Sequence, residues 1–335
     1  MNVIELTAPR LDALRAASYA KPSPRLGEAL VRVRATSLNF LDIAVATGKI
    51  PVPGFPFVPV SDGAGEIAEL GEGVNGWAVG DRVVPHFMSD WQDGRMTPAV
   101  FAARRGVTRP GSLAEYVVVP AASLVAIPDH LSFAQAATLP IAATTAWRAV
   151  RAAGLGPHST ALLLGTGGVS IFALQFAKAH GARVIVTSSS DEKLERARRL
   201  GADLTVNYRQ TPEWDMEVLR LTEGRGADLV LETGGAETFP RSINAAAMNG
   251  TVFVIGFLSG TRPTIDVIEI MQKELRIQGN NTGPVADLAA ATAAIAAHRL
   301  APVVDQTFEM KDTAEAYAHL AAGGRHFGKI AISVD

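Results

Sequence analysis

The 335-residue chain contains no cysteine, so disulfide bonds and thiolate catalysis are excluded and a cytoplasmic location is expected. It also lacks a charge excess, since 31 Lys and Arg face 33 Asp and Glu, and no long basic run offers a surface for nucleic acid or an anionic membrane. Its uncharged stretches, 131–147 and 160–177, are broken by Pro140 and by a glycine turn, so neither is expected to span a membrane. The expected partner is a small molecule.

The length of the chain predicts two domains, because 335 residues exceed what one hydrophobic core usually supports. In the first third, Gly and Pro separate short strand-like runs, which predicts a β-rich domain. From about residue 123, strands alternate with Ala-rich helices, which predicts an α/β doubly wound parallel sheet. The expected strands are 28–35, 62–70, 82–85 and 114–119 in the first part, 161–164, 184–186, 204–207, 227–232, 250–256 and 275–279 in the sheet, and 328–334 at the end.

The segment 160–193 reads as a strand, a glycine turn, a helix and a second strand, which is a βαβ nucleotide-binding unit. Glycines are expected at three positions because a Cβ would block the tight turn and the approach of a pyrophosphate to the N–H groups of the helix start. The third position of the motif is Ser170 rather than Gly or Ala. A bound dinucleotide is preferred over a purely structural turn. The predicted contacts are Gly165, Thr166, Gly167, Gly168 and Val169.

The second strand of this unit ends in Ser188 and Ser189, where an NAD-preferring unit usually has an acidic residue for the ribose 2′-hydroxyl. Small hydroxyls followed by Lys193 can accept and neutralise a 2′-phosphate, so NADP is favoured while NAD remains an alternative. In the other interpretation Ser190 and Asp191 cap the next helix and Lys193 is a solvated charge. The two interpretations can hold together.

Eight segments resemble the medium-chain dehydrogenase/reductase superfamily, and most of all its zinc-independent, quinone-oxidoreductase-like branch. The resemblance implies a Rossmann domain inserted in a GroES-like catalytic domain. The implied boundaries are 1–122 (GroES-like), 123–262 (Rossmann) and 263–335, where the sheet ends near 282 and the chain returns to the catalytic domain. A homodimer joined along the strand edge near 250–257 is also implied. The segments are SLNFLD (37–42), PVSDGAGEI (59–67), VGDRVV (79–84), LAEYVVVP (113–120), ATLPIAATTAWRA (137–149), GTGGVS (165–170), GFLSG (256–260) and HFGKIAI (326–332).

The chain departs from the zinc alcohol dehydrogenases at the metal positions. Asn39 stands where those enzymes have a cysteine, Ser61 and Asp62 replace a His-Glu pair, and Ile141 lies near the third ligand. The four thiolates of the structural zinc lobe have no counterpart between residues 86 and 112. These side chains cannot supply the ligands that zinc needs, so no zinc is expected.

Without a metal, hydrogen bonds must polarise the substrate oxygen, and Asn39 is the first candidate donor. The alternative for Asn39 is that it only holds a turn. The resemblance gives Asp42 the role of orienting this loop. Loop 86–96 is either a lid that offers Phe87 or Trp91 to an apolar substrate or a loop tethered by these aromatics to its own domain. The remaining cofactor contacts that the resemblance implies are Thr145, Asn207, Gly234, Gly256, Phe257, Leu258 and Asn280.

The sequence therefore predicts a metal-free, NAD(P)H-dependent oxidoreductase that transfers a hydride to a conjugated carbonyl substrate, either an enone or a quinone-like compound. A zinc-independent alcohol dehydrogenase or aldehyde reductase is the first alternative. A nucleotide-binding protein without turnover is an alternative of another class.

Overall fold

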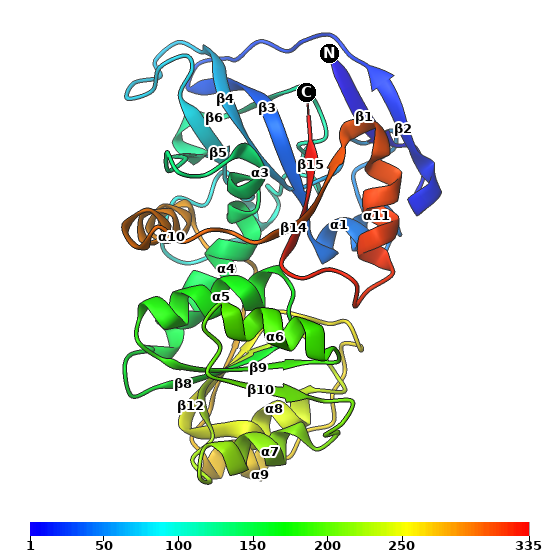
Figure 1. Cartoon of the computed structure of the whole chain (residues 1–335). Coiled ribbons are helices and arrows are strands. Elements are labelled where there is room, and N and C mark those ends of the chain that lie inside the picture. Colours follow the sequence, from blue (N-terminus) through cyan, green and yellow to red (C-terminus); the bar gives the residue numbers. More distant parts are fainter. Residues whose placement is uncertain (335) are drawn as a thin grey trace. The chain divides into compact units, whose positions relative to one another are not determined.

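The computed structural model describes residues 1–334 and divides into two compact units (Figure 1). The first contains Met1–Thr144 and the chain from Gly283 onward, and the second contains Thr145–Thr282. Segment 123–144, expected in the dinucleotide-binding domain, belongs to the first unit. The reason is strand pairing, since β7 (Leu124–Ala126) bonds to β5 (Arg82–Pro85) in the sheet of that unit.

The second unit is a six-stranded parallel sheet, as the alternation of strands and helices predicts. Its strand order is β10-β9-β8-β11-β12-β13. The strands are β8 (Thr160–Leu164), β9 (Arg183–Ser188), β10 (Leu204–Asn207), β11 (Ala227–Glu232), β12 (Ala246–Val254) and β13 (Arg276–Gly279). A cluster of buried apolar side chains joins one face of the sheet to α7 (Trp214–Leu221), α8 (Phe239–Ala245) and α9 (Val267–Gln272). Figure 1 shows α5 (Gly168–Ala179) and α6 (Asp191–Arg199) on the other face.

The outer edge of this sheet differs from the expectation. The strand near 250–257 was expected at the edge, but β12 bonds to β11 on one side and to β13 on the other. β13 extends the sheet by one strand and is itself the edge. Any pairing with a second copy through this edge must therefore use β13.

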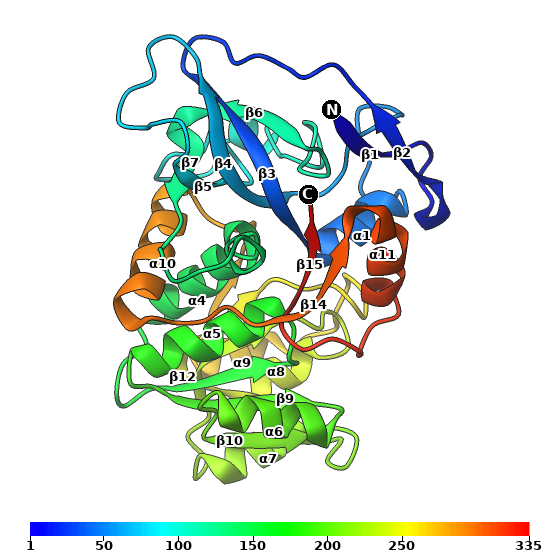
Figure 2. The same ribbon diagram turned by 45° about the horizontal axis from the view of Figure 1, so that its top comes forward.

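The first unit is built on a seven-stranded sheet with the order β14-β15-β3-β4-β5-β7, and β6 also pairs with β3. Figure 2 shows the long β3 (Glu28–Leu38) between β15 (Lys329–Ser333) and β4 (Asp62–Leu70). The remaining strands are β1 (Asn2–Leu6), β2 (Leu14–Ser18), β6 (Tyr116–Pro120) and β14 (Val304–Glu309); the helices are α1 (Phe40–Ala46), α2 (Pro98–Phe101), α3 (Phe133–Ala136), α10 (Val285–His298) and α11 (Thr313–Ala321). α4 (Thr144–Ala153) begins at the junction of the units. Among residues 1–334, no helix combines the length and the apolar character needed to cross a membrane.

Loop 86–96 is anchored by its own aromatic side chains. Phe87 and Trp91 are 3% and 2% exposed and pack in a cluster with Val45, Met88 and Val107 of the same unit. The indole N–H of Trp91 donates to the carbonyl oxygen of Gly94, which lies within the loop. The geometry therefore supports the tethered loop rather than a lid that presents these two rings to a substrate.

Candidate functional site

The glycine turn follows β8 and leads into α5, with Gly167 as the N-cap residue. Gly165 has φ +73°, a conformation that a residue with a Cβ rarely adopts. A Cβ built on Gly165 or Gly167 would meet no described atom within 4 Å. The need for glycine at 167 therefore does not come from the protein itself, contrary to the expectation of a blocked turn. The open space beside a helix N-terminus fits an anionic pyrophosphate.

Ser170, the unusual third residue of the motif, is buried in the first turn of α5. Its hydroxyl donates to the carbonyl oxygen of Leu164 at the end of β8 at 2.8 Å, and the hydroxyl of Thr233 donates to the same oxygen at 2.8 Å. The serine thus ties the helix to the strand that precedes the turn. Two other predicted contacts, Thr145 and Thr166, are buried, while Gly168 and Val169 are half-buried in the first turn of α5.

The end of β9 carries Ser188, which is buried, and Ser189, which is half-buried. Ser190 caps α6, because its hydroxyl accepts the backbone N–H of Lys193 at 3.4 Å. The predicted cap at Ser190 is confirmed. Asp191 lies in the first turn of the helix and accepts the side-chain amides of Asn207 and Gln210, and Lys193 lies half-buried in the same turn.

Two residues near this strand end were missed by the sequence reasoning. The backbone N–H of Tyr208 donates to the carbonyl oxygen of Ser188 at 3.1 Å, so the segment after β10 lies beside the serines. Tyr208 is 41% exposed, and Arg209 follows it on the surface. The signal was the position of this Tyr-Arg pair directly after a predicted strand. Asn207 instead supports α6, since its amide donates to Asp191 at 2.7 Å.

Glu232 organises the loop after β11. This buried carboxylate accepts the N–H groups of Gly234 and Gly235 at 2.7 and 2.8 Å and the hydroxyl of Thr238 at 2.7 Å. The loop packs against the turn after β12, because a Cβ on Gly256 would lie 1.7 Å from the carbonyl oxygen of Thr233. The turn presents two exposed apolar side chains, Phe257 and Leu258.

Asn280 follows β13, and its backbone N–H bonds to β12. Its side-chain nitrogen and oxygen are both buried, and neither has a hydrogen-bond partner among the described residues. Such a group in a native protein calls for a partner that the polypeptide does not supply. A polar ligand with both a donor and an acceptor, such as a carboxamide, matches this side chain. The second unit therefore fits a dinucleotide at its glycine turn, and the unpartnered amide of Asn280 calls for a ligand or an ordered water.

In the first unit, five polar residues form one hydrogen-bonded group, the Asn39 network. The ammonium of Lys329 donates to Asn39 Oδ1 at 2.6 Å, and Asn39 Nδ2 donates to Asp62 Oδ2 at 2.8 Å. Asp42 accepts the backbone N–H of Asn39 at 2.7 Å and that of Ser61 at 3.1 Å. Asp42, Ser61, Asp62 and Lys329 are buried, whereas Asn39 is half-buried. The network therefore reaches the surface through Asn39.

Burial shifts the titration of the charged members. It raises the pKa of Asp42 to about 7, against the opposing effect of the Asn39 N–H. Burial also raises the pKa of Asp62, opposed by Lys329 and by hydrogen bonds from Asn39. The pKa of Lys329 is lowered by burial, which Asp62 and Asp42 oppose.

The four positions compared with zinc ligands lie close together, yet they do not fit a zinc ion. The backbone N–H of Ile141 bonds to Asp62, and this carboxylate also receives the Asn39 amide. Lys329 Nζ lies 3.5 Å from the same carboxylate, so a cation is already in place. Zinc takes thiolate, imidazole and carboxylate ligands, and here one carboxylate is offered beside an amide, a hydroxyl and an apolar side chain. Within the described residues, no group of three or more His, Asp or Glu residues could hold a metal.

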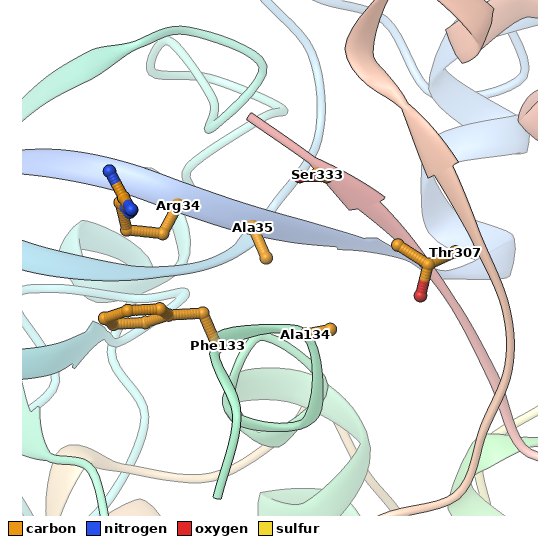
Figure 3. Close-up of a pocket in the computed structure, with 6 residues that line it drawn as sticks. All are labelled: Arg34, Ala35, Phe133, Ala134, Thr307 and Ser333. Atoms are coloured by element: carbon orange, nitrogen blue, oxygen red, sulfur yellow. The ribbon is translucent and has the colours of Figure 1, made fainter. Parts of the chain in front are cut away.

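A separate pocket of about 190 Å³ lies in the first unit (Figure 3). The Arg34 guanidinium lies over the Phe133 ring at 5.9 Å from its centroid, at one end of the pocket. The described lining residues, Arg34, Ala35, Phe133, Ala134, Thr307 and Ser333, include none of the predicted site residues. This pocket is therefore not part of the candidate site.

Two family descriptions match the chain: an alcohol dehydrogenase GroES-like domain over residues 25–129 and a zinc-binding dehydrogenase over residues 168–297. A zinc-type alcohol dehydrogenase-like protein of Schizosaccharomyces pombe is 42% identical over 97% of this chain and 96% of its own length. A quinone oxidoreductase of Pseudomonas aeruginosa is 31% identical over 90% of each chain. The chain belongs to the medium-chain dehydrogenase/reductase superfamily and is an NAD(P)-dependent oxidoreductase of that type.

Solved relatives share the fold over the whole chain. The structure of an NAD-dependent alcohol dehydrogenase has 36% identity, a TM-score of 0.90 and complete coverage of both chains. A mycobacterial protein in complex with NADPH has 26% identity and a TM-score of 0.83, and it covers all of both chains. Both forms of the nicotinamide cofactor thus occur among the relatives.

Proposed function

We propose that this protein reduces a conjugated carbonyl compound, an enone or a quinone-like substrate, with NADPH and without a metal ion. The Asn39 network carries the proposal. Two of the positions compared with zinc ligands hold the amide of Asn39 and the carboxylate of Asp62, which are hydrogen-bonded to each other, and the buried ammonium of Lys329 donates to the amide. Asn39 is the half-buried member of this group. An amide nitrogen carries two hydrogens, so Asn39 can give one to Asp62 and the other to a substrate oxygen.

The chemistry favours reduction of a conjugated substrate. A bound nicotinamide supplies the hydride. As the hydride arrives, negative charge grows on the substrate oxygen and is delocalised into an enolate, which the N–H of Asn39 stabilises. Alcohol oxidation would also need a base for the hydroxyl proton. Asp42 and Asp62 are buried and already accept hydrogen bonds, which suits them to support Asn39 rather than to take that proton.

The preference for NADPH rests on the end of β9. Ser188 and Ser189 bring no carboxylate to the ribose, and Lys193 lies in the first turn of the next helix. The backbone N–H of Tyr208 bonds to the carbonyl oxygen of Ser188, so the segment that carries Tyr208 and Arg209 passes beside this strand end and can offer a phenol and a guanidinium. Guanidinium, ammonium and hydroxyl groups are the usual partners of a phosphate. Together they form a 2′-phosphate site.

The test is spectrophotometric NADPH oxidation over enones, quinones, aldehydes and ketones, beside NADP-linked oxidation of alcohols. We expect turnover of enones or quinones and no dependence on chelators. Elemental analysis should find no zinc in the purified protein. One zinc per chain would contradict the metal-free assignment. Alcohol oxidation without any enone or quinone turnover would favour the second candidate, a zinc-independent alcohol dehydrogenase. The names of two relatives contain the words alcohol dehydrogenase, and one of these names describes a zinc-type protein.

We also propose a homodimer that pairs through β13. This edge strand has unpaired backbone groups on one side, and Ile277 on it is 40% exposed. The adjacent α9 adds exposed Val267, Ile268 and Met271, which are 59%, 52% and 68% exposed. An apolar patch of this kind on a sheet edge is typical of a subunit interface. Light scattering should report a dimer at micromolar protein, and Ile277→Lys should give a monomer. A monomeric wild-type protein would refute the pairing.

A further inference from the structure

Lys329 opens β15, and its ammonium is the only buried cation that the Asn39 network contains. The strand runs antiparallel to β3 with Ile330 opposite Leu38, so the preceding residue, Lys329, reaches the end of β3 where Asn39 begins the next helix. The side chain is 5% exposed. It donates to the carbonyl oxygen of Leu38 at 2.7 Å and to Asn39 Oδ1 at 2.6 Å.

The neighbours of Asn39 allow one orientation of its amide. In the observed orientation the amide oxygen faces the ammonium of Lys329 and the amide nitrogen faces the carboxylate of Asp62. If the amide were turned by 180°, its N–H groups would face the ammonium and its oxygen would face the carboxylate. Both contacts would then be repulsive, at sites where burial strengthens electrostatic effects. Lys329 and Asp62 thus determine which end of Asn39 is the donor.

A cation on the amide oxygen also changes the donor strength of the amide nitrogen. A hydrogen bond to Oδ1 draws electron density away from Nδ2, and the N–H groups become more strongly polarised. The cost of burying the ammonium is offset by its three oxygen neighbours, on Leu38, Asn39 and Asp62.

We propose that Lys329 is a positioning residue that holds the Asn39 amide with its N–H toward the substrate oxygen and strengthens that N–H as a donor. The inference rests on the proposed role of Asn39 as the hydrogen-bond donor. It assigns to a lysine 290 positions away in the sequence the electrostatic task that a metal ion performs in metal-dependent dehydrogenases. The lysine acts through Asn39 and does not itself contact the substrate.

The kinetic experiment is a double-mutant cycle between Lys329→Met and Asn39→Ala. We expect Lys329→Met to lower kcat roughly 10- to 100-fold, with the NADPH Kd within about threefold of wild type. Adding Lys329→Met to Asn39→Ala should change kcat by less than about threefold, because both changes remove the same donor. Independent, multiplicative effects or an unchanged kcat in Lys329→Met would overturn the proposal. Lys273→Met is the matched control, since Lys273 also donates to backbone carbonyl oxygens but belongs to the second unit, and its kcat should not change.

Loss of the lysine leaves Asp62 without its cation, so Lys329→Met can fail to fold. The double variant Lys329→Met/Asp62→Asn removes both charges and keeps the side-chain volumes. It should fold and still show the low kcat. Recovery of wild-type kcat in this variant would contradict the proposal.

A readout that needs no turnover separates this inference from the proposed function. Neutron diffraction locates the two hydrogens of an amide nitrogen and so distinguishes it from the amide oxygen, which ordinary X-ray data do not. Neutron structures of the wild type and of the double variant should show the Asn39 amide held in one orientation in the first and turned or divided between two in the second. If the wild type reduces no conjugated substrate but the amide still turns, the proposed function fails and the positioning role stands. If the amide orientation is unchanged in the variant, the positioning role fails.

Discussion

The two units build their sites by different means. In the second unit the candidate cofactor site is made mostly of backbone: a glycine with positive φ, the N-terminus of α5 and glycines where two loops pass closely. In the first unit it is made of side chains, most of them buried, and the titratable groups of Asp42, Asp62 and Lys329 belong to one network. A site made of backbone groups can be predicted from residues that are neighbours in the sequence. A network of side chains instead depends on how strands distant in the sequence pair.

The largest effect should follow from removing the surface-reaching member of the network. Asn39→Ala should lower kcat roughly 10- to 1,000-fold, because the growing negative charge on the substrate oxygen loses its donor. The NADPH Kd, measured by fluorescence titration, should change little, since the predicted cofactor contacts lie in the second unit. An Asn39→Ala variant with normal kcat would show that the Asn39 network has no part in catalysis and that its role in the first unit is structural.

The second effect concerns cofactor choice in the second unit. Wild-type protein should bind NADPH more tightly than NADH, and Ser189→Asp should weaken NADPH binding about 10- to 100-fold through repulsion of the 2′-phosphate. Ser189→Asn is the matched control, because it has the same size without the charge. Titrations with both cofactors would check this. Equal or tighter NADH binding by the wild type would show that the serines do not select the phosphate.

The sequence predicted the second unit better than the first, because all six strands of the parallel sheet were expected whereas β1, β2, β7 and β14 of the first unit were not. The bounds of β10 and β11 match the expected strands, and the βαβ unit of the glycine turn is confirmed. β4 and β5 of the first unit also match. The edge strand of the parallel sheet was misassigned, because an apolar run such as 250–256 does not reveal whether another strand covers it.

The Asn39 network was predicted only in part. Asn39 and Asp42 share the capped start of α1, so their association follows from helical spacing. Lys329 was missed, because a lysine that opens an expected strand is usually a solvated residue, and its partner is 290 positions away. The pairing of β15 with β3 brings it there. Local pattern cannot reveal a contact of this kind.

A third prediction concerns the protonation of Asp42, which should make the free energy of unfolding depend on pH. The pKa of Asp42 is raised from its ordinary value of 3.8 to about 7, so between about pH 4 and pH 7 the folded protein holds a proton that the unfolded chain releases. This contribution to stability is complete below pH 4 and is lost as the pH rises through 7. Its slope is at most about 1.4 kcal/mol per pH unit. Asp62, with a raised pKa, acts in the same direction, while the lowered pKa of Lys329 acts oppositely at alkaline pH.

Urea unfolding gives the free energy of unfolding of the wild type and of Asp42→Asn at each pH between 4 and 8. The difference between the two proteins measures the contribution of the Asp42 proton. The wild type should lose stability relative to the variant as the pH rises, and the difference should level off as the pH approaches 8. Parallel curves would show that Asp42 is ionised throughout this range and that burial does not raise its pKa.

The smallest effect is expected in the second unit, at Ser170. Its hydroxyl donates to the carbonyl oxygen of Leu164, but Thr233 donates to the same oxygen, so Ser170→Ala leaves that acceptor satisfied. The free energy of unfolding should fall by about 0.5–1.5 kcal/mol, and NADPH binding should be unchanged, because alanine is common at this place in dinucleotide-binding turns. Thr233→Ala should cost a similar amount. The double variant strands a buried carbonyl group and should lose more than the sum of the two single changes. Additive losses would mean that water replaces the hydroxyls, and the strand end would then be more open than the apolar sheet around it indicates.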